Sequence, residues 1–257
     1  MKKNISVFGC GWLGEPLAIS LIQKGFSVNG STTSESKIPM LASKGINPFL
    51  LNLENITPEI ESFLTADVLV VNIPSKNIAG FKNLVSHIEK SSIQKVIFIS
   101  STSVYDNSEQ IITEKSQVKE SALVEIEQLF QLNSSFETTI IRFSGLLGYS
   151  RKPGNFFKNG RKIPNPEGFV NMIHQDDCVS IIEQIIIQNC WNEVFNACAD
   201  THPSRRDFYN KSFLDIGLNQ PFFNENDSKE NKIVSNKKLK KILNFEFKFP
   251  DLLNLPS

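Results

Sequence analysis

The chain contains 257 residues, of which 40% are hydrophobic and 21% are charged, and its 27 basic and 27 acidic side chains give a formal net charge of zero. This composition is typical of a soluble globular protein, and the balanced charge gives no sign of a nucleic-acid or membrane partner. No apolar run approaches the ~18 residues that a membrane helix needs.

The N-terminal segment predicts a strand that runs directly into a helix. Residues 5–9 read as a buried strand, and Leu13, Leu17 and Leu21 then place apolar side chains on one helix face that ends before Gly25. The apolar run of this strand is too short for a lipoprotein signal, whose apolar region needs roughly 7–15 residues.

The rest of the first half alternates strands with helices. The strands read as nearly continuous apolar runs, which is typical of a parallel sheet covered by helices on both faces. The sequence therefore predicts an α/β fold. We expect strands at 26–32, 46–53, 67–74 and 95–102, and helices at 35–44 and around 84–88.

The second half begins in the same way and then becomes less regular. Residues 148–168 are rich in Gly, Pro and basic side chains and read as a loop on the substrate side. No repeat or flexible linker interrupts the chain, so we expect one extended unit, 1–257. Its core would take about 1–145 and 170–200, and a substrate lobe about 146–169 and 201–257. We expect helices at 118–132, 176–188, 204–216 and 235–243, and strands at 136–143 and 193–198.

The four cysteines favour free thiols over disulfide bonds. Cys10, Cys178, Cys190 and Cys198 form no C-x-x-C pair, and no His lies at zinc-ligand spacing from them. We therefore expect reduced, mostly buried thiols in a cytoplasmic protein, rather than a disulfide framework, and no metal site.

A G-x-G-x-x-G motif follows the first strand and opens the first helix. Gly9 permits a tight turn, Gly11 lets the backbone approach a pyrophosphate, and Gly14 lets the helix pack closely on the strand. The alternative is a glycine-rich turn with no ligand. The motif predicts dinucleotide binding by Gly9, Cys10, Gly11, Trp12, Leu13 and Gly14.

The end of the second strand bears on which dinucleotide is bound. An acidic residue at this place would bind the ribose 2′-hydroxyl of NAD, but here Ser31, Thr32 and Thr33 occupy it. Hydroxyl groups can bind a 2′-phosphate, and Lys37 lies within reach. The sequence therefore predicts NADP or NAD as the cofactor, with a mild preference for NADP.

Six stretches occur in the order found in a known family: GCGWLGEPLA, ISSTSVYD, IIRFSGLLGYSRKPGNFF, VNMIHQDDC, VFNACADTHPSR and NKKLKKILNFEFKFPD. Together they resemble the extended, atypical short-chain dehydrogenase/reductases, which are NAD-dependent epimerase/dehydratase-like proteins. The likeness is greatest to the YeeZ-type bacterial subgroup and covers nearly the whole chain. It implies a Rossmann-type doubly wound parallel sheet with a small C-terminal substrate lobe. It also implies an oxidoreductase that acts on a small substrate, such as a sugar- or nucleotide-linked molecule.

The resemblance also implies roles for individual residues. Ser101 matches the active-site Ser/Thr that hydrogen-bonds the substrate oxygen, and Tyr105 follows it near the substrate. His174 lies in an element beside the substrate cleft, where a structural histidine is an equal alternative. Asn52 matches a position near the adenine. The loop that passes the nicotinamide ribose corresponds to Asn72, Ile73 and Pro74.

The sequence departs from the family at the usual catalytic pair, Tyr-x-x-x-Lys. In the family the tyrosinate is the acid/base, and the lysine lowers its pKa. Four residues after Tyr105, Tyr149 and Tyr209 come Glu109, Pro153 and Phe213, so the pair occurs nowhere in the chain. By alignment, Gln117 and Ser121 take its two places.

Two functions remain open at this point. The first is an NAD(P)-dependent enzyme in which Tyr105, Lys119 or His174 supplies the proton. The second is a dinucleotide-binding sensor or regulatory protein without turnover. Arg151, Lys152, Arg161 and Lys162 favour an anionic substrate, although a solvated loop explains them as well. We expect a small-molecule partner, neither nucleic acid nor membrane, and a monomer or homodimer.

Overall fold

The computed structural model describes residues 3–227 and 231–255. The chain divides into two units, each of which is described separately. The division that we predicted from the sequence, into a core and a substrate lobe, stays a prediction. Unit 1 comprises Met1–Ser100, Glu120–Ile141 and Val179–Val194, and unit 2 comprises Ser101–Lys119, Arg142–Cys178 and Phe195–Ser257.

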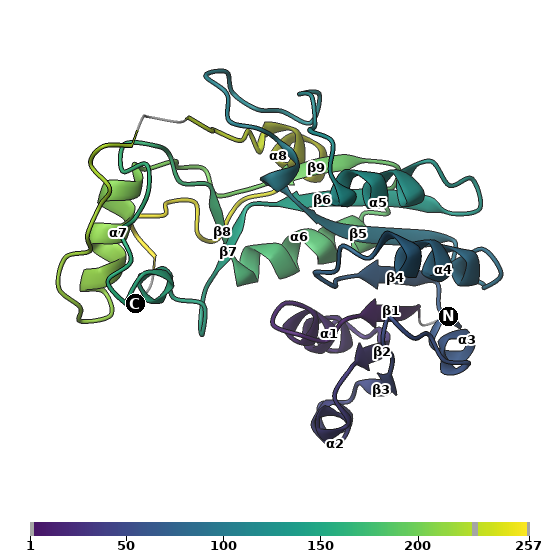
Figure 1. Ribbon diagram of the computed structural model, residues 1–257. Coiled ribbons are helices and arrows are strands. Elements are labelled where there is room, and N and C mark those ends of the chain that lie inside the picture. Colours follow the sequence, from purple (N-terminus) through teal and green to yellow (C-terminus); the bar gives the residue numbers. More distant parts are fainter. Residues whose placement is uncertain (1–2, 228–230, 256–257) are drawn as a thin grey trace. The chain divides into compact units, whose positions relative to one another are not determined.

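Among the described residues, seven strands form the main sheet: β1 (Asn4–Phe8), β2 (Ser27–Thr32), β3 (Asn47–Leu50), β4 (Val68–Val71), β5 (Lys95–Ser101), β6 (Glu137–Phe143) and β9 (Val194–Ala197). Their order is β3-β2-β1-β4-β5-β6-β9 (Figure 1). The pairs β1–β2, β1–β4, β2–β3 and β4–β5 are parallel. This topology confirms the Rossmann-type doubly wound sheet, because the strand order reverses on either side of β1.

The helices of unit 1 lie between the strands along the chain. The helix expected at 35–44 is a 3-10 turn, Glu35–Lys37 (η1), followed by a short α-helix in whose first turn Pro39 sits, where a missing N–H costs little. A further short helix at 59–63 was not anticipated. The α-helices are α1 (Gly14–Gln23), α2 (Ile38–Ser43), α3 (Glu59–Phe63), α4 (Ile78–Ile88), α5 (Ala122–Gln131) and α6 (Gln175–Ile187), whose first turn belongs to unit 2.

The start of α5 corrects the helix expected at 118–132. The hydroxyl of Ser121 accepts a hydrogen bond from the backbone N–H of Val124 at 3.3 Å, so Ser121 is the N-cap and the helix begins at Ala122. Gln117 therefore lies outside the helix. The two positions aligned with the missing Tyr-x-x-x-Lys pair do not share a helix face.

Phenylalanine fills the core of unit 1. Phe8, Phe63, Phe81, Phe98 and Phe130 are all buried in one cluster. The rings of Phe98 and Phe130 stack with centroids 4.8 Å apart, and the ring of Phe81 meets both edge-on. These rings bury large apolar areas and leave no polar atom to satisfy in the core.

Unit 2 has a small sheet and a core of its own. In this sheet two short strands pair in parallel, with Leu147 opposite His174. Its core gathers Leu147, Phe157, Phe208 and Leu252. No helix in the described ranges of either unit is long and apolar enough to cross a membrane. The elements of unit 2 are β7 (Gly145–Leu147), β8 (Met172–His174), α7 (Arg205–Leu214), α8 (Lys237–Leu243) and the 3-10 turns η2 (Thr102–Val104) and η3 (Pro153–Phe156).

Candidate functional site

Two glycines of the turn between β1 and α1 are required by the protein's own packing. Gly9 has φ +108°, and a Cβ there would come 2.5 Å from the backbone oxygen of Asn72. A Cβ on Gly14 would come 2.1 Å from the oxygen of Gly9. The amide of Asn72 donates to that same oxygen at 3.1 Å. The turn is therefore held against the end of β4 with no room for side chains.

Gly11 differs from these two glycines. A Cβ built on Gly11 meets nothing within 4 Å, so no contact inside the protein explains its missing side chain. Gly11 instead lines a cavity of about 480 Å³ in unit 1. Leu13, the N-cap of α1, makes no side-chain cap. Glu15 N–H already donates to the Gly11 oxygen at 3.1 Å and Pro16 has no N–H, so the part of the turn that is open to a ligand is the backbone at Gly11. The site therefore fits a phosphate-bearing group that approaches the backbone at Gly11.

Ten of the thirteen predicted cofactor residues line this cavity. Trp12, Leu13 and Gly14 do not line it. They lie in the turn and its helix start, and Trp12 is half-buried beside Gly11. Lys37 and Glu54 also line the cavity. The ten are Gly9, Cys10, Gly11, Ser31, Thr32, Thr33, Asn52, Asn72, Ile73 and Pro74.

The hydroxyls at the end of β2 have different surroundings. Ser31 and Thr32 are buried, and each accepts a hydrogen bond from the protein backbone, Ser31 from Gly9 N–H and Thr32 from Ser34 N–H. Thr33 and Lys37 are exposed. Each of the two buried hydroxyls keeps its own proton to donate, and the exposed groups at this edge are the hydroxyl of Thr33 and the ammonium of Lys37.

The Cys10 thiol also lies in this cavity, but it is not poised for chemistry. Burial raises its pKa to about 12, with a smaller contribution from Glu15, and Lys37 opposes the shift. The thiolate is the reactive form of cysteine. Cys10 therefore contributes shape and backbone to the cavity.

Ser101 lines a separate cavity of about 460 Å³ within unit 2. Its hydroxyl accepts a hydrogen bond from Ser103 N–H at 3.1 Å and caps η2. Several side chains in the same cavity were not singled out from the sequence, namely Asn165, Asn171, Arg205, Tyr209 and Lys232. They come from loops and from α7, and no motif or period connects them.

Lys232 is the most notable of these. Its ammonium donates to the backbone oxygen of Tyr105 at 2.5 Å. Burial lowers the pKa of Lys232, Lys119 lowers it further, and Asp106 opposes the shift. The Asn171 amide donates to the Lys232 oxygen at 2.6 Å and accepts from Val234 N–H at 2.9 Å, which fixes the segment that carries this lysine.

The Tyr105 hydroxyl lies in a buried hydrogen-bond network. It donates to Asn196 at 2.9 Å and accepts from Arg142 at 2.7 Å, and Tyr105 is only 1% exposed. Burial raises its pKa, while Arg142 opposes the shift. Tyr105 does not line the cavity of Ser101. It lines another cavity of unit 2, together with residues of the segment from Asp106 to Lys119.

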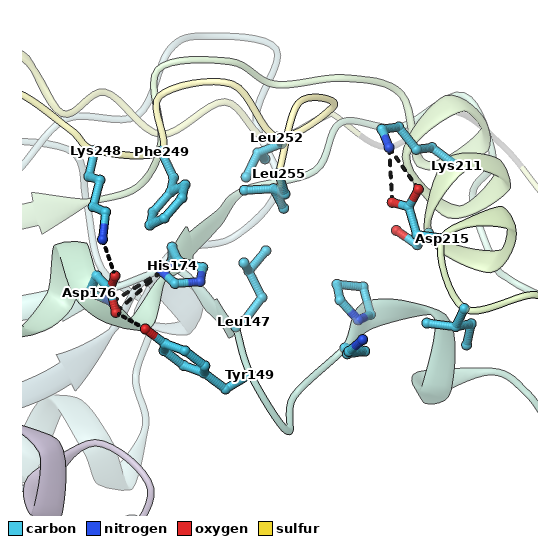
Figure 2. Close-up of a pocket in the computed structure, with 15 residues that line it drawn as sticks. Leu147, Tyr149, His174, Asp176, Lys211, Asp215, Lys248, Phe249, Leu252 and Leu255 are labelled. Carbon is cyan, nitrogen blue, oxygen red and sulfur yellow. Dashed lines mark hydrogen bonds and ion pairs between the residues drawn. The ribbon is translucent and has the colours of Figure 1, made fainter. Parts of the chain in front are cut away.

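His174 lines a further cavity in unit 2, of about 360 Å³ (Figure 2). The three residues expected to be catalytic, Ser101, Tyr105 and His174, thus line three different cavities, and the structure does not bring them together. Of the basic loop residues, Lys152 lines the His174 cavity. Arg161 lies over the ring of Phe157, 4.7 Å from its centroid.

Comparison with known proteins gives a consistent result. The family described as the NAD binding domain of 6-phosphogluconate dehydrogenase matches residues 4–125. Protein YeeZ of Escherichia coli strain K12 is 31% identical over 272 residues, which covers 99% of this chain and 99% of that protein.

Solved structures of similar fold include two epimerases. The UDP-glucuronic acid 4-epimerase of Bacillus cereus in complex with NAD has a TM-score of 0.80 at 16% identity, covering 98% of this chain and 95% of that one. The UDP-glucose 4-epimerase of Thermotoga maritima with UDP-glucose has a TM-score of 0.76 at 16% identity, covering 95% and 94%. These two likenesses concern the fold alone.

Proposed function

Because the chain belongs to the YeeZ-type family of NAD-dependent epimerase/dehydratase-like proteins, we propose that it is an NAD(P)-dependent oxidoreductase or epimerase. Its dinucleotide binds in the unit 1 cavity, and its small substrate is sugar- or nucleotide-linked. The observation that carries the proposal is Gly11, which lines the cavity and has open space where a side chain would stand. A pyrophosphate placed there lies against the backbone of the glycine turn, at the positive end of the α1 dipole.

The edge of the cavity supports a mild preference for NADP. Thr33 and Lys37 are exposed there, and a hydroxyl and an ammonium both suit a 2′-phosphate. Glu54 also lines the cavity, but its carboxylate accepts a hydrogen bond from the Asn77 amide. No acidic residue stands at the end of β2 to repel the phosphate.

The Ser101 cavity is the proposed substrate site. Arg205 and Lys232 bring two positive charges to it, and the buried Nε of Arg205 has no hydrogen-bond partner among the described residues. A buried donor of this kind costs stability unless a ligand satisfies it, so an anionic substrate such as a nucleotide-linked sugar suits the cavity. The UDP-glucose 4-epimerase of Thermotoga maritima has been crystallised with UDP-glucose.

Each polar group of this cavity has a separate role in the proposed reaction. The nicotinamide cofactor, when bound, would accept a hydride from the substrate or return one to it. Ser101 hydrogen-bonds the reacting oxygen, as the family resemblance implies. Lys232 holds the proton that a tyrosine holds in other family members, because it lines the same cavity and its pKa is lowered. Tyr105 is less suited, since its hydroxyl is bonded to Arg142 and Asn196.

Calorimetric titration with NADPH and NADH tests the cofactor site. The unmodified protein should bind, and Gly11→Val should abolish binding while its circular dichroism stays unchanged, because its side chain enters open space rather than protein. Gly14→Val serves as the contrast and should unfold the turn, since its Cβ would overlap the oxygen of Gly9. Unchanged affinity in a folded Gly11→Val protein would refute the site.

Turnover distinguishes the enzyme from the alternative, a non-catalytic sensor. The absence of the Tyr/Lys pair favours the sensor, because a positioned acid/base is worth ~10²–10⁴ in rate. An oxidoreductase should form NADPH slowly from NADP and a UDP-sugar, whereas an epimerase should convert the UDP-sugar to its epimer with no net change of the cofactor. In either case Ser101→Ala and Lys232→Met should abolish the reaction while NADPH binding persists. Binding without turnover by the unmodified protein across a panel of nucleotide sugars would favour the sensor.

A further inference from the structure

The His174 cavity is a separate compartment of unit 2. It shares no lining residue with the Ser101 cavity or with the dinucleotide cavity. Its volume of about 360 Å³ lies within the range of small-molecule pockets, roughly 300–1,000 Å³. Neither the proposed cofactor nor the proposed substrate accounts for it, so it needs an explanation of its own.

The walls of the cavity are largely apolar. Figure 2 shows Leu147 on one side of the central space and Leu252 and Leu255 on the other, with Phe249 next to His174. The rings of Phe249 and His174 lie 4.0 Å apart. Leu147 and Leu252 belong to the core of unit 2 and are each only 2% exposed, so they are fixed from behind and present a small apolar face to the cavity.

His174 offers one defined hydrogen-bond donor to this space. The backbone N–H of Asp176 donates to Nδ1 of His174 at 3.2 Å, so Nδ1 is an acceptor and the proton of the neutral ring is on Nε2. Burial lowers the pKa of His174, as does Lys248, while Asp176 opposes the shift. The ring is therefore neutral near pH 7 and donates from Nε2.

Gly148 packs closely against the ring of His174. It has φ +120°, and a Cβ there would come 2.7 Å from Nε2 of His174. Gly148 also lines the cavity. A side chain at this position would collide with the ring, so glycine lets the backbone pass close to His174 at the edge of the cavity.

One lysine in the lining of the cavity has no carboxylate partner among the described residues. Lys248 pairs with Asp176 at 2.7 Å, and Tyr149 donates to the same carboxylate at 2.8 Å. Lys211 pairs with Asp215 at 2.8 Å. Lys152 lines the cavity and has no ion-pair partner among the described residues. With His174 neutral, the lining therefore carries an excess of one positive charge.

We propose that this cavity is a binding site for a small monocarboxylate with an apolar, aromatic or branched body. The apolar body packs against Leu147, Phe249 and Leu252, and the carboxylate is neutralised by Lys152 and accepts from Nε2 of His174. A dianionic phosphate suits the cavity less well, because the lining has an excess of only one positive charge, that of Lys152. The site is independent of the proposed enzymatic function.

Phenylacetate is the probe that tests this proposal, with phenylacetamide, acetate and phenyl phosphate as matched controls. The imidazole signals of the three histidines, His87, His174 and His202, are assigned by single His→Gln variants and followed by NMR during titration. Phenylacetate should shift the His174 signals and leave the other two in place. It should bind at least about tenfold more tightly than the amide or acetate, since each lacks one of the two interactions.

Charge-removing variants complete the test. Lys152→Met should weaken phenylacetate binding about tenfold and leave phenylacetamide binding unchanged. Lys158→Met is the matched control, because Lys158 is exposed in the same loop and does not line the cavity. The proposal is overturned if phenylacetate does not shift His174, if the amide or phenyl phosphate binds as tightly, or if the two lysine variants behave alike. NADPH titration of the same samples reports separately on the dinucleotide site.

Discussion

The hydroxyl of Ser31 accepts a hydrogen bond from the backbone N–H of Gly9 at 2.9 Å. The Ser31 backbone oxygen also accepts from Cys10 N–H at 2.7 Å, so the end of β2 is tied to the glycine turn at two points. Ser31 is 2% exposed. It shapes the turn, and we expect the exposed groups beside it, Thr33 and Lys37, to decide between the two dinucleotides.

Lys37→Glu should reverse the cofactor preference. A carboxylate at the end of η1 repels a 2′-phosphate, so the ratio of NADPH to NADH affinity should fall about tenfold or more, mainly through loss of NADPH binding. Calorimetry with both cofactors measures this ratio. Lys90→Glu changes the net charge equally, outside the cavity, and should leave the ratio unchanged. Equal effects of the two variants would mean that Lys37 acts only through net charge.

Tyr105→Phe should act on stability rather than on cofactor binding. The change removes the hydroxyl that bonds to Arg142 and Asn196 in a buried network, which should lower the free energy of unfolding by about 1–3 kcal/mol. Urea unfolding measures the loss, and NADPH affinity should not change. A variant as stable as the parent but without turnover would restore Tyr105 as a catalytic candidate.

The cysteines should differ in reactivity. Burial raises the pKa of both Cys10 and Cys198 to about 12, and raises that of Cys178 as well, whereas Cys190 is only half-buried. Brief treatment with iodoacetamide near pH 8 should therefore alkylate Cys190 first, and the other three only after unfolding. Peptide mass spectrometry gives the order. Early labelling of Cys10 would show that its thiol is more accessible to solvent than this structure has it.

His174 should make the protein less stable in mild acid. Its pKa in the folded protein is lowered, chiefly by burial. As the pH falls through about 6.5, His174 is therefore protonated in the unfolded chain before it is protonated in the folded one, and this favours unfolding. The free energy of unfolding should therefore fall between about pH 7.5 and 5.5, and His174→Gln should make that fall smaller. Urea titrations at the two pH values test this, and an equal fall in both proteins would contradict it.

Much of unit 1 could be predicted from the sequence because its signals are local. Strands such as β4 are buried on both faces, so each appears as a continuous apolar run, and the glycine motif marks the turn to α1. The short strands β7 and β8 gave no such signal. They hold only three residues each, and their pairing depends on the path of the chain between them.

The candidate sites were harder to predict. Ser101 and His174 belong to motifs that the family resemblance brings to one cleft, yet they line different cavities here. The sequence did not indicate Lys232, because its pKa is lowered by burial beneath loops. Neither a hydrophobic periodicity nor a motif in the sequence predicts such burial. Ser31 was predicted as a cofactor residue and lines the cavity, but the sequence does not show that its hydroxyl also accepts from Gly9 N–H and so ties the turn to β2.

Trp12 gives the glycine turn an optical signal of its own. It directly follows Gly11, the chain has one other tryptophan, Trp191, and its many phenylalanines emit almost nothing when tryptophan is excited. The reduced nicotinamide ring absorbs light in the range where tryptophan emits. In a Trp191→Phe variant, fluorescence therefore comes from the turn alone, and its quenching by NADPH follows occupancy of the cofactor cavity in real time, without a label or a known substrate.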